Sequence, residues 1–186
     1  FLKRILCVMD AFVIDACCMI NLFAAGGLRS RLSVIGGTWY VPSVVATESL
    51  YVHEEGPDGT ISRVSIELQT LLNDHTLLPC TVENAAEQDL YVKLATEIDD
   101  GEAVALAIAR MRGWTLATDH RKAGRLAADL SVSVLTTPDL MKRWADSASP
   151  DPSELQRVLC RIEQLAAFAP SARHPLYDWW RDSARG

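Results

Sequence analysis

The sequence lacks the features of several classes of protein. No apolar run approaches the roughly 20 residues that a membrane-spanning helix needs. The five cysteines form no CxxC pair and have no histidine at zinc-finger spacing, so we expect reduced thiols and not a disulfide framework. Internal repeats and low-complexity tracts are also missing. These absences predict a globular, cytoplasmic protein without a membrane anchor.

The chain also lacks an excess of positive charge. Its net charge is −6, so a global positive field is not expected to guide it to nucleic acid. Any contact with nucleic acid therefore has to be local. Divalent cations held by carboxylates would offset part of this charge, which makes the net charge weak support for either view.

The length and composition indicate one folded domain with a tail. Of the 186 residues, 49% are hydrophobic and 23% are charged. A domain of this size buries roughly 70% of the surface that its unfolded chain exposes. SASPDPSE, at 147–154, is the one segment with a clear linker composition. We therefore expect a domain over residues 1–146, and a linker with a C-terminal helical tail over 147–186.

Short apolar segments alternate with helical patterns along the domain. We expect strands at 11–16, 38–42, 76–80, 114–118 and 131–137. Helices are predicted at 17–27, 42–53, 83–98, 100–112, 119–130, 138–146 and, in the tail, 153–168. Segment 54–60 is a predicted loop, and segment 61–75 fits a helix or a strand, with the helix weakly favoured. This alternation is typical of an α/β fold with a mainly parallel sheet flanked by helices.

Four carboxylates occupy positions where a functional site is expected. Open parallel sheets bind ligands at the carboxyl ends of their strands, and Asp15 and Asp119 end two predicted strands. Glu48 lies beside the apolar stripe of its predicted helix, and Glu102 lies on a face of small residues. An inward carboxylate without a partner costs several kcal/mol, by order of magnitude. We find no lysine or arginine at matching inward positions, so a shared metal ion is the simplest partner.

Oxygen ligands favour hard ions, which here means Mg²⁺ or Mn²⁺ rather than zinc. A pair of such ions can polarise a phosphate, activate a water molecule and stabilise the leaving oxygen. Each acid also has an ordinary alternative. Asp15 and Asp119 could cap helices, Glu48 could pair with a surface base, and Glu102 could favour a helix N-terminus. Their joint spacing favours the metal site.

Four segments, in this order, resemble the signature blocks of the PIN-domain family: VIDACCMINL, VPSVVATESLYV, DDGEAVALAIA and LATDHRKAGRLAADLSVSVLTTPDLM. The resemblance covers about residues 11–146, and the last two blocks are its more specific part. It implies a metal-dependent ribonuclease in which Asp15, Glu48, Glu102 and Asp119 are the metal ligands and catalytic residues. Many relatives are toxins of bacterial toxin-antitoxin pairs, and others process RNA.

Two positions depart from the family pattern. The residue two places after the first aspartate is often serine or threonine and is Cys17 here, which removes a strong hydroxyl donor. The block usually written TDD reads TDH, so His120 stands where an acid can support a second ion. The first metal ion is therefore expected, and the second is left open. Of the neighbouring acids, Asp100 is expected to reach the metal through water more readily than Asp99.

A basic helix follows Asp119. Arg121, Lys122 and Arg125 lie near the partial positive charge of its N-terminus, where a bound phosphate would be beside the metal. The same residues fit a solvated basic face equally well. The aromatic and basic segment 172–186 could stack on bases, but we favour its docking on the domain's own surface.

We therefore predict an endoribonuclease that hydrolyses RNA phosphodiester bonds with a water activated by Mg²⁺ or Mn²⁺. It would act as a toxin restrained by a small antitoxin protein, or as a stand-alone processing enzyme, with a homodimer as a further option. The alternative is a non-catalytic PIN-like RNA-binding or scaffold protein. His120 favours this alternative, and the complete set of four acids opposes it.

Overall fold

The computed structural model describes residues 10–48, 50–56, 58 and 60–186. Cys7 and the rest of the first nine residues lie outside this range. The strands are β1 (Ala11–Ile14), β2 (Thr38–Pro42), β3 (Tyr51–Glu55), β4 (Ile61–Ser65), β5 (Leu78–Cys80), β6 (Thr115–Ala117) and β7 (Val134–Leu135). The helices are α1 (Ala16–Ala24), α2 (Leu28–Ile35), α3 (Ser43–Ala46), α4 (Leu68–Asn73), α5 (Ala85–Leu94), α6 (Asp100–Arg112), α7 (Arg121–Asp129), α8 (Thr137–Ala148), α9 (Pro152–Leu165) and α10 (Tyr177–Arg185).

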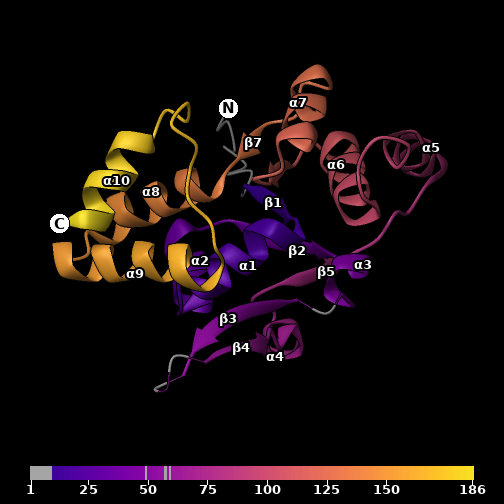
Figure 1. The fold of residues 1–186 in the computed structure, drawn as a ribbon. Helices are drawn as coiled ribbons and strands as arrows, with labels where there is room; N and C mark the ends of the chain where they lie inside the picture. The colour runs from indigo at the N-terminus through magenta and orange to yellow at the C-terminus, as the bar shows by residue number, and fades with distance from the viewer. Residues whose placement is uncertain (1–9, 49, 57, 59) are drawn as a thin grey trace, which may run out of the picture.

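The central sheet has five parallel strands in the order β5-β2-β1-β6-β7, with helices around it (Figure 1). Successive side chains of the central strand β1 enter two different cores, as the pleat of a strand requires. Phe12 and Ile14 belong to a core shared with α1, α8 and α9, whereas Val13 belongs to a core shared with α6 and α7. The predicted α/β fold with a mainly parallel sheet is confirmed.

The core around α6 is built from small residues. Ala103, Ala105, Ala107 and Ala109 are all buried on this helix. Because alanine side chains are short, α6 can pack close to the sheet, and it contacts both β1 and β2. This packing brings the first turn of α6, which carries Glu102, to the edge of the sheet where β1 ends.

Two local predictions are wrong. The helix predicted over 42–53 is limited to α3, and the chain then continues as β3. Segment 61–75, for which a helix was favoured, begins as β4 and becomes helical only at α4. The two strands form an antiparallel hairpin in which Val52 opposes Val64. Leu50 and Val52 alternate in burial as strand residues do, and pairing with a partner strand outweighs the local helical pattern.

The C-terminal helices share the core of the sheet. Leu159 on α9 and Trp180 on α10 belong to the same buried cluster as Phe12 of β1. Of the segment with linker composition, only residues 149–151 lie between helices, and Asp151 caps α9 by accepting from the amide of Glu154. The expected C-terminal helical tail is confirmed, while the division at residue 147 stays a prediction. Within the described residues, no helix has both the length and the apolarity needed to cross a membrane.

Candidate functional site

Asp15 lies directly after β1, buried at the carboxyl edge of the sheet. Its Oδ1 accepts a hydrogen bond from the amide of Cys18 at 2.9 Å, so the residue does cap α1. The thiol of Cys17 donates to both carboxylate oxygens, at 2.9 and 3.0 Å, and the hydroxyl of Thr118 donates to Oδ2. Burial raises the pKa of Asp15 from 3.8 to about 6, although these hydrogen bonds act in the opposite direction. Ionised Asp15 is therefore short of compensating positive charge.

Asp119 follows β6 and is held by the start of α8. The amide of Thr137 donates to its Oδ1 at 2.9 Å, and the hydroxyl of Thr137 donates to Oδ2 at 2.5 Å. Asn21 Nδ2 and Cys18 Sγ also donate to Oδ2, at 2.9 and 3.2 Å. The alternative in which Asp119 caps the following helix is wrong, because His120 is the N-cap residue of α7. Asp119 instead places its charge at the N-terminus of α8, where the helix dipole favours it.

Glu102 projects from the first turn of α6 and is half-buried. Its Oε2 lies 2.6 Å from Nδ1 of His120, but the atom has no hydrogen bond with acceptable direction. The two atoms are therefore close enough for charge attraction without a well-formed hydrogen bond. Burial raises the pKa of Glu102, and His120 partly opposes this shift. Glu102 is thus a half-buried carboxylate whose charge is only partly compensated by its neighbours.

Glu48 lies just beyond α3, not within a longer helix as predicted, and it is exposed. Its side chain reaches across Gly101: a Cβ on Gly101 would lie 3.0 Å from Glu48 Oε1 and 3.0 Å from Val45 Cγ2. Partial burial raises the pKa of Glu48, with a further contribution from Asp99. Gly101 therefore leaves the space through which Glu48 approaches the other acids.

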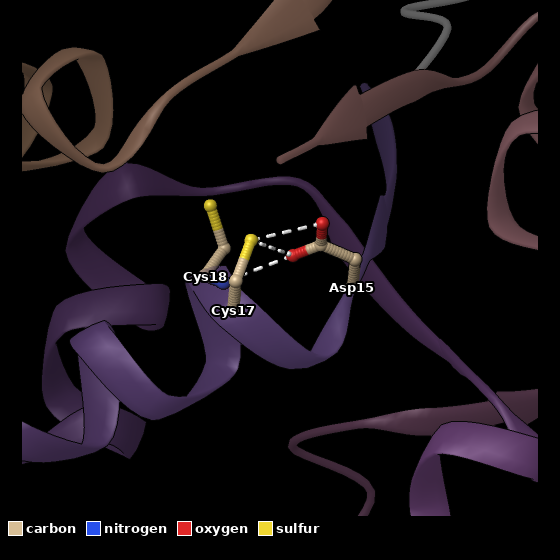
Figure 2. Close-up of side chains that lie close together, drawn as sticks. All are labelled: Asp15, Cys17 and Cys18. Carbon is tan, nitrogen blue, oxygen red and sulfur yellow. Dashed lines mark hydrogen bonds between the residues drawn. The ribbon is translucent and has the colours of Figure 1, made fainter. Parts of the chain in front are cut away.

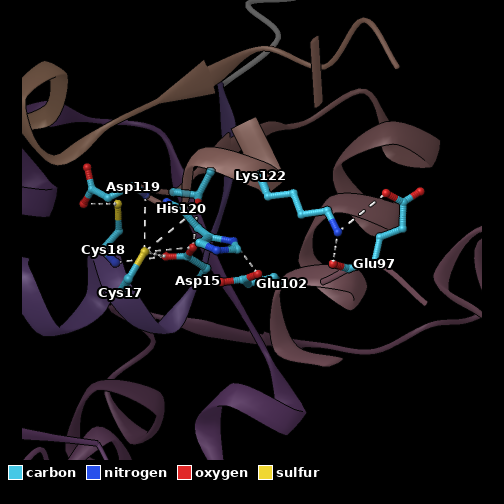
Figure 3. Close-up of polar contacts among 9 residues, drawn as sticks. Asp15, Cys17, Cys18, Glu97, Glu102, Asp119, His120 and Lys122 are labelled. Carbon is cyan, nitrogen blue, oxygen red and sulfur yellow. Dashed lines mark hydrogen bonds and ion pairs between the residues drawn. The ribbon is translucent and has the colours of Figure 1, made fainter. Parts of the chain in front are cut away.

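Three of the four predicted acids border one cavity of about 220 Å³, which we call the acid cavity. Its lining residues are Asp15, Ala16, Cys17, Ile20, Glu48, Asp99, Gly101 and Glu102. Asp119 borders a neighbouring, larger cavity. Cys17 connects the two regions, because its sulfur donates to Asp15 and accepts from the amide of Asp119 at 3.3 Å (Figure 3).

The surroundings of the acids differ from the expectations in two respects. Asp99 lines the acid cavity, whereas Asp100, the acid expected to reach the metal, accepts a hydrogen bond from the Tyr91 hydroxyl. Lys122 points away from the carboxylates and donates to the Glu97 carbonyl at 2.5 Å (Figure 3). Lys122 is therefore turned away from the acids, and RNA binding by Arg121, Lys122 and Arg125 stays a prediction.

Thiols also lie within the expected oxygen site. Ligand atoms of Asp15, Cys17 and Cys18 all lie within 4.8 Å of one another (Figure 2). Burial raises the pKa of the Cys18 thiol well above its ordinary value, and the protonated sulfur donates to Asp119. Cys17 likewise donates to Asp15, as the hydroxyl of a serine would. Both thiols therefore act as hydrogen-bond donors to the carboxylates.

The acid cavity fits a divalent cation. Three acids that line it carry raised pKa values, and a buried oxygen of Glu102 has no well-directed donor. Among the residues that line it, none is a lysine or an arginine. The residues placed to hold an ion there are Asp15, Glu48 and Glu102, with Asp99 beside them and Asp119 on the adjoining wall.

Together these features define a parallel α/β domain whose acids collect at the carboxyl ends of β1 and β6. A family model described as a PIN domain matches residues 11–167, and the chain belongs to the PIN-domain family. The match includes α9 and so extends past the segment on which the resemblance was based. PIN domains are generally nucleases and typically use divalent metal ions. A search of curated proteins found no match.

Several residues that hold the acids were not selected from the sequence. Asn21 and Thr137 bind Asp119, and Thr118 binds Asp15. Asn21 could have been selected from the sequence, since it is a polar residue on the buried stripe of an otherwise apolar helix. Thr137 could not have been selected from the sequence, because its contact with Asp119 depends on how β6 and β7 pair.

Proposed function

We propose that this protein is a metal-dependent endoribonuclease that hydrolyses RNA phosphodiester bonds in the cytoplasm. Asp15, Glu48, Glu102 and Asp119 are its proposed metal-binding and catalytic residues. The observation that carries the proposal is the acid cavity, in which three carboxylates face one another without a lysine or arginine among the lining residues. Membership of the PIN-domain family supports the reaction type. The free thiols of Cys17, Cys18, Cys80 and Cys160 agree with a reducing compartment.

In this proposal the ion is Mg²⁺ or Mn²⁺, held by Asp15, Glu48 and Glu102. When bound, it would lower the pKa of a water molecule and offset charge on the phosphate. The chain's own residues fix the carboxylates. Thr118, Cys17 and the amide of Cys18 orient Asp15, as described above. These contacts limit the reorganisation needed when substrate arrives.

His120 has a separate proposed role. It stands at the position where the family often carries a further acid, and its Nδ1 lies 2.6 Å from Glu102. An imidazole there weakens the case for a second ion at this position. An imidazole can serve as a general acid or base, so proton transfer by His120 is part of this proposal. We propose one tightly held ion, with His120 beside it.

The first test is cleavage of a single-stranded RNA by purified protein with Mn²⁺, with Mg²⁺ and with EDTA. We expect cleavage with either ion and none with EDTA. Asp15→Asn should remove nearly all activity, because it removes a charged ligand from the acid cavity. Asp129→Asn, on the exposed end of α7, is the matched control and should retain activity. Equal cleavage by wild type and Asp15→Asn, in preparations free of contaminating nuclease, would contradict the proposal.

The biological setting is also proposed. The substrate is RNA, and the regulatory partner would be a small antitoxin protein if the chain is a toxin. Self-association into a homodimer is a further expectation. Expression that arrests growth, and relief of the arrest by a small protein encoded beside this one, would support the toxin. Normal growth under strong expression of active enzyme would favour a stand-alone processing enzyme.

One observation favours the non-catalytic alternative. The oxygens of Asp119 already accept from Thr137, Asn21 and Cys18, as a structural carboxylate would. A PIN-like RNA-binding or scaffold protein would keep such contacts without a reaction. RNA binding without cleavage, over a full titration of Mn²⁺, would support this alternative against the nuclease.

A further inference from the structure

A second cavity, of about 460 Å³, adjoins the acid site and has one wall made by the C-terminal tail. We call it the tail cavity. Its lining residues are Thr118, Asp119, His120, Arg121, Gly124, Val134, Thr136, Pro138, Phe168, Ala169, Pro170, Ser171 and His174. The volume lies in the range of about 300–1,000 Å³ that is usual for small-ligand pockets. Because Thr118 and Asp119 belong to its wall, a ligand here would lie beside the proposed catalytic acids.

The tail wall is fastened in place by hydrogen bonds. Residues 168–174 lie beyond the family match, in the connection between α9 and α10 that passes α8 in Figure 1. The amide of Leu176 donates to His174 Nδ1 at 3.1 Å, which leaves the proton on Nε2. That nitrogen lies 3.0 Å from Thr136 Oγ1, and Thr136 donates to Asp139. A chain of hydrogen bonds thus ties the connection to the start of α8.

One end of the tail cavity suits an anion. Helix α7 has nine residues, its N-cap residue His120 makes no capping hydrogen bond, and its first turn contains no acid. Within the described part of the chain, no acceptor is found for the amides of residues 121–123. Arg121, an exposed residue of this first turn, also borders the cavity. Free amides, a helix dipole and a guanidinium together favour a phosphate.

The opposite wall suits a flat apolar group. Phe168 is half-buried there, and its ring meets Trp180 edge to face, with centroids 5.9 Å apart. Val134, Pro138 and Pro170 extend the apolar surface beside it. Nucleobases can stack on the faces of aromatic side chains, and such stacking is tolerant of sequence. A phosphate end and an aromatic wall in one cavity match the two parts of a nucleotide.

A glycine keeps the remaining wall open. Gly124 lies inside α7, where glycine is a poorer helix former than alanine. A Cβ at this position would meet no atom within 4 Å, so packing gives no reason for glycine. The position borders the tail cavity, and a larger side chain would occupy part of it. Gly124 thus leaves the cavity open at this position.

We propose that the tail cavity binds one nucleotide of single-stranded RNA next to the bond that is cut. Its phosphate lies at the amides of α7 and Arg121, and its base lies against Phe168. The inference rests on the proposed function, because it places the nucleotide beside Asp119. It adds that residues 168–174 form part of the substrate site and contribute to the choice of base.

The binding test uses the full chain in EDTA and three kinds of probe: the four nucleoside monophosphates, inorganic phosphate and a labelled single-stranded RNA. Gly124→Leu should weaken binding of the best monophosphate by about tenfold, because the new side chain fills the site. Ser171→Trp, on the opposite and exposed wall, should do the same. The matched control is Ala128→Leu, which adds the same side chain to an exposed position of α7 outside the cavity. Thermal melts establish that each variant is folded.

The outcomes separate this inference from the proposed function. Weaker binding in Gly124→Leu and Ser171→Trp, but not in Ala128→Leu, supports the tail cavity even if no RNA is cut. Cleavage of RNA with unchanged KM in both cavity variants overturns the tail cavity while the nuclease stands. Equal affinity for inorganic phosphate and for all four monophosphates overturns the role of Phe168. Absence of monophosphate binding to wild type at millimolar concentration also overturns the inference.

Discussion

The carboxylates in the acid cavity and the carboxylate of Asp119 meet different surroundings, although both lie at the carboxyl edge of the sheet. Asp119 accepts hydrogen bonds from Thr137 and Asn21, which hold both of its oxygens. Glu102 keeps a buried oxygen without a well-directed donor, and Glu48 is exposed. Acids at the same edge of the sheet therefore differ in how far hydrogen bonds from the chain satisfy their oxygens. Burial raises the pKa of Asp15 and Glu102 in the acid cavity, whereas Asp119 accepts hydrogen bonds at both of its oxygens.

The pH dependence of stability tests the acid cavity most strongly. Burial raises the pKa of Asp15 from 3.8 to about 6, so the folded protein binds more protons than the unfolded chain between these values. The stability that this group contributes is complete below the unfolded pKa and is lost as pH rises through the folded pKa. The free energy of unfolding of metal-free protein should fall by roughly 3 kcal/mol between about pH 4 and pH 7 from this group.

Urea unfolding in EDTA at several pH values measures this fall. Asp15→Asn cannot titrate, so its unfolding free energy should lack this component. Saturating Mn²⁺ should reduce the fall in wild type, because the ion stabilises the ionised form. The same pH dependence in wild type and Asp15→Asn would show that Asp15 is not the buried acid described above.

Asp119→Asn should lower the stability of the metal-free protein, because it disturbs a carboxylate that already accepts hydrogen bonds at both oxygens. Asparagine places an NH₂ group where the carboxylate accepts from Thr137 or Asn21. Loss of hydrogen bonds to a charged group costs about 1.5–3 kcal/mol, so metal-free Asp119→Asn should be less stable by about 2 kcal/mol. Thermal melts in EDTA at neutral pH measure the change, with Asp129→Asn as the exposed control. If the variant melts at or above the wild-type temperature, the hydrogen bonds of Asp119 do not stabilise the protein, and the contrast between Asp119 and the acid cavity is wrong.

Glu102→Gln should stabilise the metal-free protein. The substitution keeps the shape of the side chain and removes a half-buried charge near Asp99. We expect a gain of up to about 1 kcal/mol in the free energy of unfolding of the metal-free protein. The same melts measure it, and added Mn²⁺ should raise the melting temperature of the variant less than that of wild type. Equal responses to Mn²⁺ would place the ion away from Glu102.

Cys17→Ser tests the smallest difference, which is that between a thiol and a hydroxyl beside Asp15. Serine can donate the same hydrogen bond, so cleavage with Mg²⁺ should stay within about threefold of wild type. The variant should resist inhibition by Cd²⁺, since thiols favour soft ions. Inhibition curves and the ultraviolet band of cadmium bound to sulfur measure this. Identical Cd²⁺ inhibition in both proteins would exclude Cys17 as a soft ligand.

Much of the site could be predicted because it depends on local order along the chain. Asp15 and Asp119 directly follow buried strands, and the ends of neighbouring parallel strands meet at one edge of a sheet. Glu102 was predictable from the small-residue face of α6. The choice between Asp99 and Asp100 was not, because it depends on how the start of α6 turns relative to Tyr91.

By itself the sequence determined the alternation of strands and helices, the parallel sheet, the family and three acids of one cavity. These follow from periodic burial and from short motifs, which are local properties. Only the tertiary structure decided that residues 51–65 form a hairpin, that Lys122 turns to Glu97, and that residues 168–174 close a cavity beside Asp119. Each of these depends on contacts between segments far apart in the chain or on a partner strand, and hydrophobic periodicity carries no information about which segments will meet.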